Sequence, residues 1–448
     1  MKRFIISGTN SGCGKTTITC AILQALVDRK LKTSAFKCGP DYIVPMLHSR
    51  ITSGNSHNLD SFFCNDDTLN YILDSRSESA DIAVIEGVMG FYDGSKGSAY
   101  SVSEITETPV VLIIDCKGMQ DSIGAVMQGF MNYKSNRIAG FIFNRLPEKL
   151  IPFAKQLCHE NNTNYYGCFP TNSVKFESRH LGLVTAGEIS DFDEKMHQLS
   201  ELAEKYICLD ELINIADTPV PACKKPEIQR LFDENAPVIA VAKDSAFCFI
   251  YNENIEFLQE LGCKIEYFSP LEDEFIPKNA NGLILSGGYP ELYAEKLAAN
   301  RSMLADIKMH IETGMPCIAE CGGFLYLHEY LEDADKKRYG MVGLFRGLCE
   351  RSPKLQNFGY ITMKAELDNL LCDKGESFPA HEFHYWKSPD MGSAFSAYKN
   401  NGKVWECGHV SDSFYAGFPH IYFCSVPEAA IRFARKCNEY SKRSDRGK

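Results

Sequence analysis

The first half of the chain alternates short apolar runs with stretches of helical periodicity. Residues 3–7 read as a strand and residues 15–30 as a helix, and further apolar strands are expected at 81–87, 109–115 and 138–144. Unbroken apolar runs, as opposed to alternating ones, are typical of parallel strands that are buried on both faces. The pattern therefore predicts a parallel α/β sheet for this half.

The same alternation begins again in the second half. A polar helical stretch near 191–215 is followed by 216–237, which is rich in proline and charge and is typical of a linker. The strands expected after it are 237–242, 264–269, 282–288, 316–320 and 420–425. The sequence therefore predicts two tandem α/β domains, at 1–220 and 237–442, joined by a linker at 221–236.

Composition narrows the class of protein. The chain has 448 residues, of which 44% are hydrophobic, enough to fill two cores. A net charge of −11 without a basic stripe argues against a nucleic-acid partner, and no apolar run reaches the about 18 residues that span a membrane. The opening segment MKRFIISGTN reads as a strand entering a glycine turn, so we expect no signal peptide. The 18 cysteines are scattered along the chain, and we expect them to be free thiols in a reducing cytoplasm.

A phosphate-binding loop is expected at SGTNSGCGKTT, residues 7–17, because it follows a strand and opens a helix. Backbone N–H groups of such a loop cradle phosphate oxygens. Lys15 is placed to reach the β and γ phosphates, and the Thr16 hydroxyl to bind Mg²⁺. Gly8 and Gly14 enclose five residues, one more than the strict pattern has. The residues expected to contact ATP are Thr9, Asn10, Ser11, Gly12, Cys13, Gly14, Lys15, Thr16 and Thr17.

A bound Mg²⁺ needs carboxylates as well. Glu86 ends a buried strand, where a ligand for a hard cation would lie at the carboxyl edge of the sheet. Asp41 and Tyr42 follow a Gly-Pro turn, and Asp93 precedes a glycine. Both aspartates also fit ordinary turn chemistry, and spacing alone leaves the two readings open.

Together these segments resemble the N-terminal domain of the dethiobiotin synthetase superfamily and of the cobyrinic acid a,c-diamide synthases. The family motifs are Gly-Thr-x-Ser-Gly-x-Gly-Lys-Thr, Lys-x-Gly-Pro-Asp-Tyr-Ile-Asp-Pro and Glu-Gly-x-Met-Gly-x-Tyr-Asp-Gly. The second motif departs at Val44, where the family has an acid, and residues 177–184 resemble a further Glu-Arg-His-Leu-Gly-Leu segment with one residue inserted. The resemblance implies Mg²⁺ ligands at Thr16, Asp41 and Glu86. It also implies that Tyr42 and Asp93 orient the substrate carboxylate or the metal.

The segment PCIAECGGFLYL, residues 316–327, places Cys321 between a strand and a helix. Such a strand-to-helix turn is typical of an exposed nucleophile, and the small residue Gly323 lets the backbones approach. The N–H of Gly322 is expected to face a developing oxyanion, with a second donor at Gly288. Cys317 lies inside the strand and is expected to pack as a small apolar residue.

A thiol that attacks an amide needs a base, and four histidines lie in the last hundred residues. His420 stands where class I glutamine amidotransferases, which this segment resembles, carry theirs. Those enzymes have a glutamate two residues later, whereas this chain has Tyr422, so we expect a Cys321–His420 dyad. His409 is expected to be a surface or structural histidine.

The remaining histidines lie in PAHEFHYWKS, residues 379–388, which resembles the Gly-His-Glu-Phe-His-Tyr-Ser signature of the a,c-diamide synthases. His381, Glu382 and His384 lack the spacing of a helical zinc motif. Two roles stay open for them: fixing the loop near the cysteine or lining the substrate cleft, and direct chemistry.

The resemblance runs in order over nearly the whole chain. It implies a cobyrinic acid a,c-diamide synthase of corrinoid biosynthesis, with a P-loop parallel-sheet domain followed by a flavodoxin-like class I glutamine amidotransferase domain. In such enzymes a cysteine releases ammonia from glutamine, while ATP with Mg²⁺ activates the a and c acetate carboxylates of cobyrinic acid as acyl phosphates. The expected partners are therefore cobyrinic acid, glutamine and ATP, and a homodimer is left open.

Three alternatives remain. A nickel-sirohydrochlorin a,c-diamide synthase shares this architecture and chemistry, and the motifs do not separate the two. Cobyric acid synthase shares both domains, but the 379–388 block and the shorter chain favour the a,c enzymes. From another class, a partitioning-type P-loop ATPase switch carries a lysine early in the loop, where this chain has Asn10.

Overall fold

The computed structural model describes residues 2–94, 96–171, 174, 178–179, 182–183, 186–215, 219–226, 228–233 and 235–446. By its internal contacts the chain divides into two units, Met1–Pro226 and Glu227–Lys448. The division falls inside the segment 221–236 that the sequence assigns to a linker, and the linker itself stays a prediction. Within the described part of the chain, we find no helix whose length and apolar content would let it cross a bilayer.

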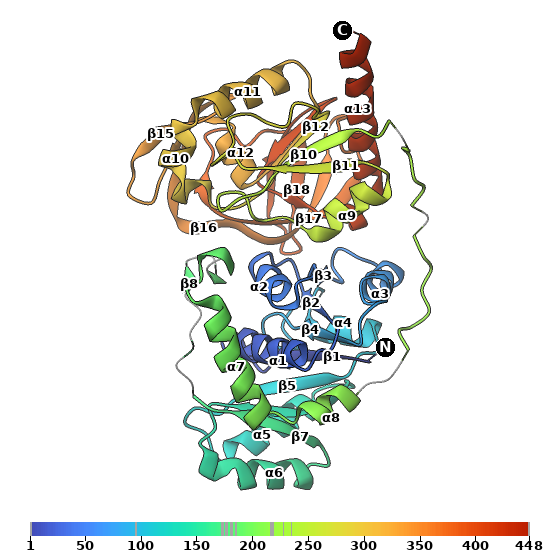
Figure 1. Ribbon diagram of the computed structural model, residues 1–448, viewed down its shortest axis with the longest axis vertical. Helices are drawn as coiled ribbons and strands as arrows, with labels where there is room; N and C mark the ends of the chain where they lie inside the picture. The colour runs from blue at the N-terminus through green and yellow to red at the C-terminus, as the bar shows by residue number, and fades with distance from the viewer. Residues whose placement is uncertain are drawn as a thin grey trace. The chain divides into compact units, whose positions relative to one another are not determined.

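Unit 1 is built on one seven-stranded sheet whose neighbouring strands are all parallel, in the order β3-β2-β4-β1-β5-β6-β7 (Figure 1). The strands are β1 Lys2–Gly8, β2 Thr33–Cys38, β3 His57–Leu59, β4 Ile82–Glu86, β5 Val110–Asp115, β6 Ile138–Asn144 and β7 Asn164–Phe169. A separate short pair joins β8 Ser178–Arg179 to β9 Gly182–Leu183. Because β1 lies between β4 and β5, the loop that follows β1 opens at the middle of the sheet's carboxyl edge.

Eight α-helices of unit 1 connect these strands in the described residues. They are α1 Lys15–Asp28, α2 Ile43–Thr52, α3 Asp66–Ser75, α4 Ala99–Ile105, α5 Ser122–Asn132, α6 Ile151–Glu160, α7 Phe192–Tyr206 and α8 Leu209–Asn214, with 3-10 turns at η1 Glu148–Leu150 and η2 Ala186–Glu188. Helices α1, α2, α7 and α8 share one core with alternate strand residues such as Ile6, Val84 and Ile113. The strand residues between these, such as Ile85 and Leu112, are also fully buried. Since successive side chains point to opposite faces, the sheet is covered on both sides, as its apolar runs predict.

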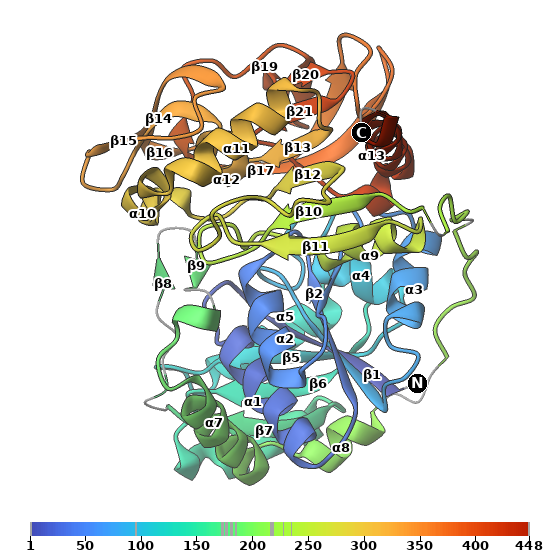
Figure 2. The ribbon, with the colours of Figure 1, turned by 45° about the horizontal axis from the view of Figure 1, so that its top comes forward.

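Unit 2 contains a six-stranded sheet in the order β11-β10-β12-β13-β21-β20 (Figure 2). Its strands are β10 Val238–Ala242, β11 Lys264–Phe268, β12 Gly282–Leu285, β13 Cys317–Glu320, β20 His409–Ser411 and β21 Phe414–Gly417. They are parallel from β11 to β21, and β20 is antiparallel at the edge. Both units are therefore α/β, as the sequence predicts.

A second, largely antiparallel sheet in unit 2 was not anticipated from the sequence. It runs β15-β14-β16-β17-β22, with β18 beside β16 and β19 beside β18. The strands are β14 His328–Glu332, β15 Arg338–Gly340, β16 Phe345–Ala365, β17 Ser377–Lys387, β18 Phe395–Tyr398, β19 Val404–Cys407 and β22 His420–Ile421. β16 and β17 are rich in polar residues, so their pattern is weaker than that of the apolar parallel strands.

The helices of unit 2 are α9 Asn252–Glu260, α10 Ala294–Ala299, α11 Arg301–Glu312, α12 Gly322–Tyr326 and α13 Pro427–Arg446, with 3-10 turns at η3 Pro290–Leu292 and η4 Phe423–Ser425. The last helix, α13, presents a clear apolar stripe. Ala430, Phe433, Ala434 and Cys437 recur at helical spacing and are all fully buried. A side chain at Gly282 of β12 would lie 2.2 Å from the Cys437 sulfur, so the helix packs directly on that strand.

The structure corrects three predicted elements. The expected strand at 420–425 stops after Ile421, because the side chain of Asn254 takes the polar backbone groups that follow: it donates to the Ile421 carbonyl and accepts from the Phe423 N–H, each at 2.7 Å. The expected strand at 282–288 ends at Leu285, before the Ser-Gly-Gly turn. The helical stretch 191–215 is two helices, since Ile207 adopts an extended conformation between them.

Candidate functional site

The phosphate loop of unit 1 leads from β1 into α1. Gly14 has φ 100, a left-handed conformation that disfavours other residues, and a Cβ there would lie 2.2 Å from the amide nitrogen of Asn144. That amide donates a 2.7 Å hydrogen bond to the carbonyl of Cys13 and so holds the loop to the end of β6. Sequence reasoning missed Asn144; its position at the end of a buried strand was the available signal.

Lys15, the first residue of α1, points back over the loop. Its Nζ donates to the carbonyl oxygen of Asn10 at 3.1 Å and to that of Met89 at 2.5 Å. Burial lowers the pKa of Lys15, and the nearby ammonium of Lys37 acts in the same direction. The ammonium thus lies where phosphate oxygens at the loop would replace the two carbonyls as its partners.

The other predicted nucleotide contacts lie in the same loop or in the first turn of the helix. The Thr9 hydroxyl donates to the Asn10 side chain at 3.0 Å, and the Asn10 amide donates to the Ser11 carbonyl at 2.8 Å. Cys13 is fully buried, with its sulfur against Gly8. Gly12 has φ 78, and Thr16 and Thr17 open α1.

Glu86, at the carboxyl end of β4, is the buried anion beside this loop. Its Oε1 accepts a 2.7 Å hydrogen bond from the Thr16 hydroxyl, and its Oε2 lies 3.0 Å from His48 Nε2. The Lys37 ammonium is 3.9 Å from Oε1. Burial alone would raise the pKa of Glu86, but Lys37, His48 and Thr16 outweigh it and lower that pKa. The carboxylate is therefore held ionised.

Hydroxyl and carboxylate oxygens are hard donors that suit Mg²⁺, and Mg²⁺ on a nucleotide uses one or two protein carboxylates with phosphates and water. The Thr16 and Glu86 pair fits that requirement. Across the described residues, no group of three or more His, Cys, Asp or Glu side chains is placed to hold a metal ion by itself. The donor set thus fits a metal that is shared with a nucleotide.

The structure gives Asp41 and Asp93 local roles at the same edge of the sheet. Asp41 Oδ1 accepts from the N–H groups of Ile43 and Val44, both at 3.0 Å, and so starts α2. Asp93 Oδ2 accepts from the Gly90 N–H at 3.0 Å. Tyr42, half-buried, precedes α2. Both carboxylates therefore form turns, and their predicted metal or substrate roles stay predictions.

In unit 2, Cys321 is the sharp corner between β13 and α12. Its backbone has φ 47 and ψ −99, a strained conformation for a residue with a side chain. The corner is tight because a Cβ at Gly323 would lie 2.1 Å from the Leu285 carbonyl oxygen, and one at Gly322 would lie 2.9 Å from the Gly288 nitrogen. Gly288 therefore lies close to Gly322 at the elbow, and the oxyanion role of their N–H groups stays a prediction.

The Cys321 side chain is 5% exposed, and burial is the main factor that raises its pKa, with Glu291 and Glu382 acting in the same direction. The resting group is accordingly a thiol and not a thiolate. Cys317, four residues earlier, is fully buried in the apolar core, as predicted.

His420 begins β22 and is fixed by a carboxylate that sequence reasoning missed. Its Nδ1 lies 3.2 Å from Glu320 Oε2, and Glu320 Oε1 accepts a 3.0 Å hydrogen bond from the Ile421 N–H. A Cβ at Gly287 would lie 2.6 Å from His420 Cε1 and 3.4 Å from Nε2, so the far edge of the ring lies over the glycine turn. Glu320 directly precedes Cys321 in the sequence, but no local pattern links it to His420.

The 381–384 block lies in β17, next to β22. His381 pairs with His420 across the two strands, and its pKa is lowered to about 3, mainly by burial and secondarily by His420. Glu382 Oε1 lies 2.8 Å from His384 Nε2, and the Cys321 sulfur lies 4.0 Å from the Phe383 carbonyl oxygen. The block therefore borders the cysteine, and both of its predicted roles stay open.

Two further predictions concern other segments. His409 Nε2 lies 3.2 Å from the Asp390 carbonyl oxygen, in keeping with a structural histidine. Half of the 177–184 segment lies outside the described residues, and the predicted resemblance of this segment stays a prediction.

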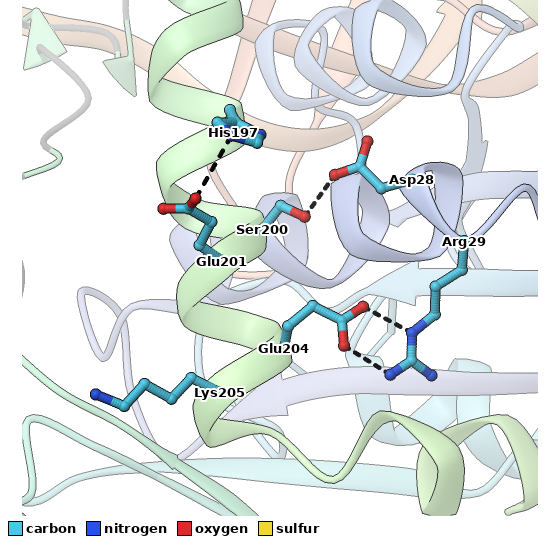
Figure 3. Close-up of a pocket in the computed structure, with 7 residues that line it drawn as sticks. All are labelled: Asp28, Arg29, His197, Ser200, Glu201, Glu204 and Lys205. Atoms are coloured by element: carbon cyan, nitrogen blue, oxygen red, sulfur yellow. Dashed lines mark hydrogen bonds and ion pairs between the residues drawn. The ribbon is translucent and has the colours of Figure 1, made fainter.

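A depression of about 620 Å³ lies where α7 runs beside the end of α1 (Figure 3). Its side chains pair with one another: Ser200 donates to Asp28 at 2.6 Å, and two guanidinium nitrogens of Arg29 lie 2.7 Å from the Glu204 oxygens. These contacts join the two helices, so the polar side chains of the depression serve to hold α7 against the end of α1.

Comparison with known proteins agrees with this geometry. The family model of the CobQ/CobB/MinD/ParA nucleotide binding domain matches residues 4–179, and that of the CobB/CobQ-like glutamine amidotransferase domain matches residues 238–427. These matches confirm the predicted pair of domain types.

Full-length relatives are similar as well. The cobyrinate a,c-diamide synthase of Caldanaerobacter subterraneus subsp. tengcongensis is 36% identical over 98% of this chain and 99% of its own. That of Clostridium tetani is 39% identical over 94% and 97%, and that of Clostridium acetobutylicum 36% over 94% and 97%.

Proposed function

The chain belongs to the cobyrinate a,c-diamide synthase family, and from that premise we propose that it amidates the a and c acetate carboxylates of cobyrinic acid. As a member of this family it is a glutamine-dependent, amide-forming ligase with a nucleotide-binding domain and an amidotransferase domain. We assign the ATP-dependent half to residues 1–220 and the glutaminase to residues 237–442. The observation that carries the proposal is the strained Cys321 elbow in a chain aligned end to end with these ligases.

In the glutaminase half, Cys321 Sγ attacks the side-chain amide carbon of glutamine. Because burial keeps this thiol protonated, a base has to take its proton as the S–C bond forms. His420 is that base in our proposal; it then passes the proton to the departing nitrogen, which leaves as ammonia. The N–H groups of Gly322 and Gly288 stabilise the oxyanion. Water then cleaves the thioester, and glutamate is released.

In the ATP half, a carboxylate oxygen of the substrate attacks the γ-phosphate, and ADP leaves. Lys15 neutralises charge on the transferred group, while Thr16 and Glu86 hold the metal side of the nucleotide. A bound Mg²⁺ would neutralise negative charge on the β and γ phosphates. Ammonia then displaces phosphate from the acyl phosphate to form the amide. Tyr42 and Asp93 are our proposed groups for orienting the substrate carboxylate or the metal, with Asp41 as a further ligand.

An ATPase switch with an inactive amidotransferase fold is disfavoured by the same geometry. Backbone strain at Cys321 costs about 1–3 kcal/mol, and a domain without chemistry gains nothing from keeping it. His420 lies over Gly287, and the next residue, Gly288, has its nitrogen close to Gly322 of the elbow, which supports our proposal that this half carries out acyl transfer.

The test is to offer cobyrinic acid and nickel sirohydrochlorin separately, each with ATP, Mg²⁺ and glutamine, and to count added amides by mass spectrometry. We expect two amides on cobyrinic acid, with ADP and glutamate formed in step. Amidation of nickel sirohydrochlorin alone would transfer the assignment to that macrocycle. Amidation of neither would overturn the proposed reaction.

A further inference from the structure

Glu320 is a buried carboxylate that the mechanism above does not use. Its side chain lies at the end of β13, one residue before the nucleophile, and it is 8% exposed. We propose that Glu320 is the positioning carboxylate of the glutaminase, which orients the His420 ring and stabilises the imidazolium formed when Cys321 gives up its proton. This inference rests on the proposed glutaminase roles of Cys321 and His420.

The two oxygens of Glu320 have different partners, and this fixes the carboxylate plane. Oε1 accepts the Ile421 N–H at 3.0 Å, and Oε2 lies 3.2 Å from His420 Nδ1. Because a carboxylate is an acceptor only, it selects the tautomer that carries its proton on Nδ1. His420 Nε2 then holds a lone pair and is able to accept a proton.

The ring edge that carries Nε2 faces the glycine turn. Only the missing Cβ of Gly287 leaves room for it, since His420 Cε1 would lie 2.6 Å from such an atom. The same turn supplies Gly288, whose nitrogen is close to Gly322 of the elbow. The ring edge with Nε2 therefore faces the turn whose Gly288 adjoins the Cys321 elbow.

The position two residues after the histidine, where class I glutamine amidotransferases carry a glutamate, is Tyr422 in this chain. Tyr422 is fully buried there, and its ring packs edge-on against Tyr251 with centroids 5.0 Å apart. Glu320 reaches the histidine from a different strand, one hundred residues earlier in the chain. The carboxylate that contacts His420 therefore comes from the residue beside the nucleophile, not from the position two residues after the histidine.

The contact between Glu320 and His420 lies in mainly apolar and uncharged surroundings. A cavity of about 30 Å³ beside Glu320 is lined mainly by apolar side chains, with Ser286 and Asn254 as polar members. On the other side His381, in β17, lies opposite His420 and remains neutral because burial lowers its pKa to about 3. Glu320 therefore supplies the negative charge that directly contacts the imidazolium.

The test compares Glu320→Gln with Glu320→Asp in the full-length enzyme. In the Gln variant the Ile421 N–H still donates to the amide oxygen, so the NH₂ group faces His420 Nδ1. An NH₂ group donates, and it therefore selects the tautomer that carries its proton on Nε2. We expect kcat for glutamine hydrolysis to fall about 100-fold or more, while KM for glutamine changes less than about threefold. The Asp variant keeps the charge, so its kcat should be at least about tenfold higher than that of the Gln variant. Glu312→Gln, at an exposed carboxylate of α11, is the matched control.

Amidation with free ammonia and the unfolding temperature separate a positioning role from a structural one. Both should stay at the parental level in Glu320→Gln. Retention of more than half of the parental kcat would overturn the inference, and so would an equal loss of glutamine-dependent and ammonia-dependent amidation.

Cys321→Ser tests the underlying chemistry in the same series. If it keeps glutaminase activity, the proposed function itself fails. If it loses that activity while Glu320→Gln does not, only the role of Glu320 fails.

Glu320→Ala adds a chemical test. The shortened side chain enlarges the neighbouring cavity, and added formate should restore hydrolysis in a saturable way, by about tenfold or more. Formate should have no effect on Glu312→Gln. Absence of rescue in a variant that still amidates with ammonia would count against the inference.

Discussion

The hydroxyl of Thr16 and the carboxylate of Glu86 meet at 2.7 Å, although they belong to a helix and a strand seventy positions apart. This contact lies beside the phosphate loop because β1 and β4 are parallel neighbours whose carboxyl ends share one edge. The proposed placement of ATP-dependent activation in unit 1 rests on this contact.

Glu86→Gln should abolish activation but leave glutamine hydrolysis. We expect amidation with either glutamine or ammonia to fall about 100-fold or more, about 3 kcal/mol of barrier, because the anionic oxygen is lost. ADP release with each nitrogen source measures this. Glu160→Gln, at an exposed position on α6, is the control. A variant that amidates normally with ammonia would show that Glu86 does not act in activation.

Cys321→Ser and Cys317→Ser form a matched pair on one strand-to-helix segment. The first should reduce glutamine-dependent amidation to below about 1% and leave ammonia-dependent amidation intact, since only the nucleophile is changed. The second places a hydroxyl in the apolar core and should lower stability by about 1–3 kcal/mol while retaining both activities. Glutamate release and urea unfolding distinguish the two. Loss of both activities in Cys321→Ser would mean that the residue is structural.

Gly287→Ala should disturb the base without unfolding unit 2. The new methyl group would lie 2.6 Å from His420 Cε1, so the ring has to shift, and a misplacement of this size costs about 100-fold in rate. The readout is glutamine hydrolysis beside ammonia-dependent amidation, which should be unchanged. Gly129→Ala, at a helical position with open space, should affect neither. Parental hydrolysis in Gly287→Ala would contradict the placement of the ring.

His328 should make unit 2 sensitive to acid. It is fully buried, with Nδ1 2.8 Å from the Phe324 carbonyl oxygen and Nε2 2.9 Å from Ser388 Oγ, and burial lowers its pKa from 6.5 to about 4. Between pH 6.5 and about pH 4, His328 is protonated in the unfolded chain but not in the folded chain. Stability is therefore lost as pH falls below 6.5, up to about 3 kcal/mol near pH 4.

The check is urea unfolding as a function of pH. His328→Gln should be less stable at neutral pH but should lose less stability on acidification than the parent does. Ser388→Ala removes a partner without removing a titratable group, so its pH dependence should stay steep. An unchanged slope in His328→Gln would refute this account.

The elements that the sequence predicts correctly are those with a strong local signal. Strand β6 coincides with the expected 138–144, and the phosphate loop and the Cys321 elbow lie where their glycines indicate. In each case a few neighbouring residues determine the backbone, because glycine allows conformations that other residues resist. The antiparallel strands β16 and β17 were missed, since their mixed polar and apolar residues form no continuous apolar run.

The partner of His420 could not be derived from spacing. Its contact with Glu320 depends on β13 and β22 meeting in space across one hundred positions, and no local pattern encodes that. The His48 and Lys37 contacts to Glu86 are of the same kind. Composition and motif order identified the family, whereas the electrostatics of each site required the fold.

The local hydrogen bonds of Asp41 and Asp93 have a consequence for the order of binding. In the free enzyme these carboxylates are engaged in turns, so Thr16 and Glu86 offer two of the six oxygen ligands that Mg²⁺ prefers. Phosphates, water and the ligand proposed at Asp41 would supply the others. The free enzyme should hold the cation weakly, so the cation and ATP arrive and depart as a single complex. Uncomplexed ATP should then act as a competitor of the true substrate, and an excess of nucleotide over magnesium should slow the enzyme.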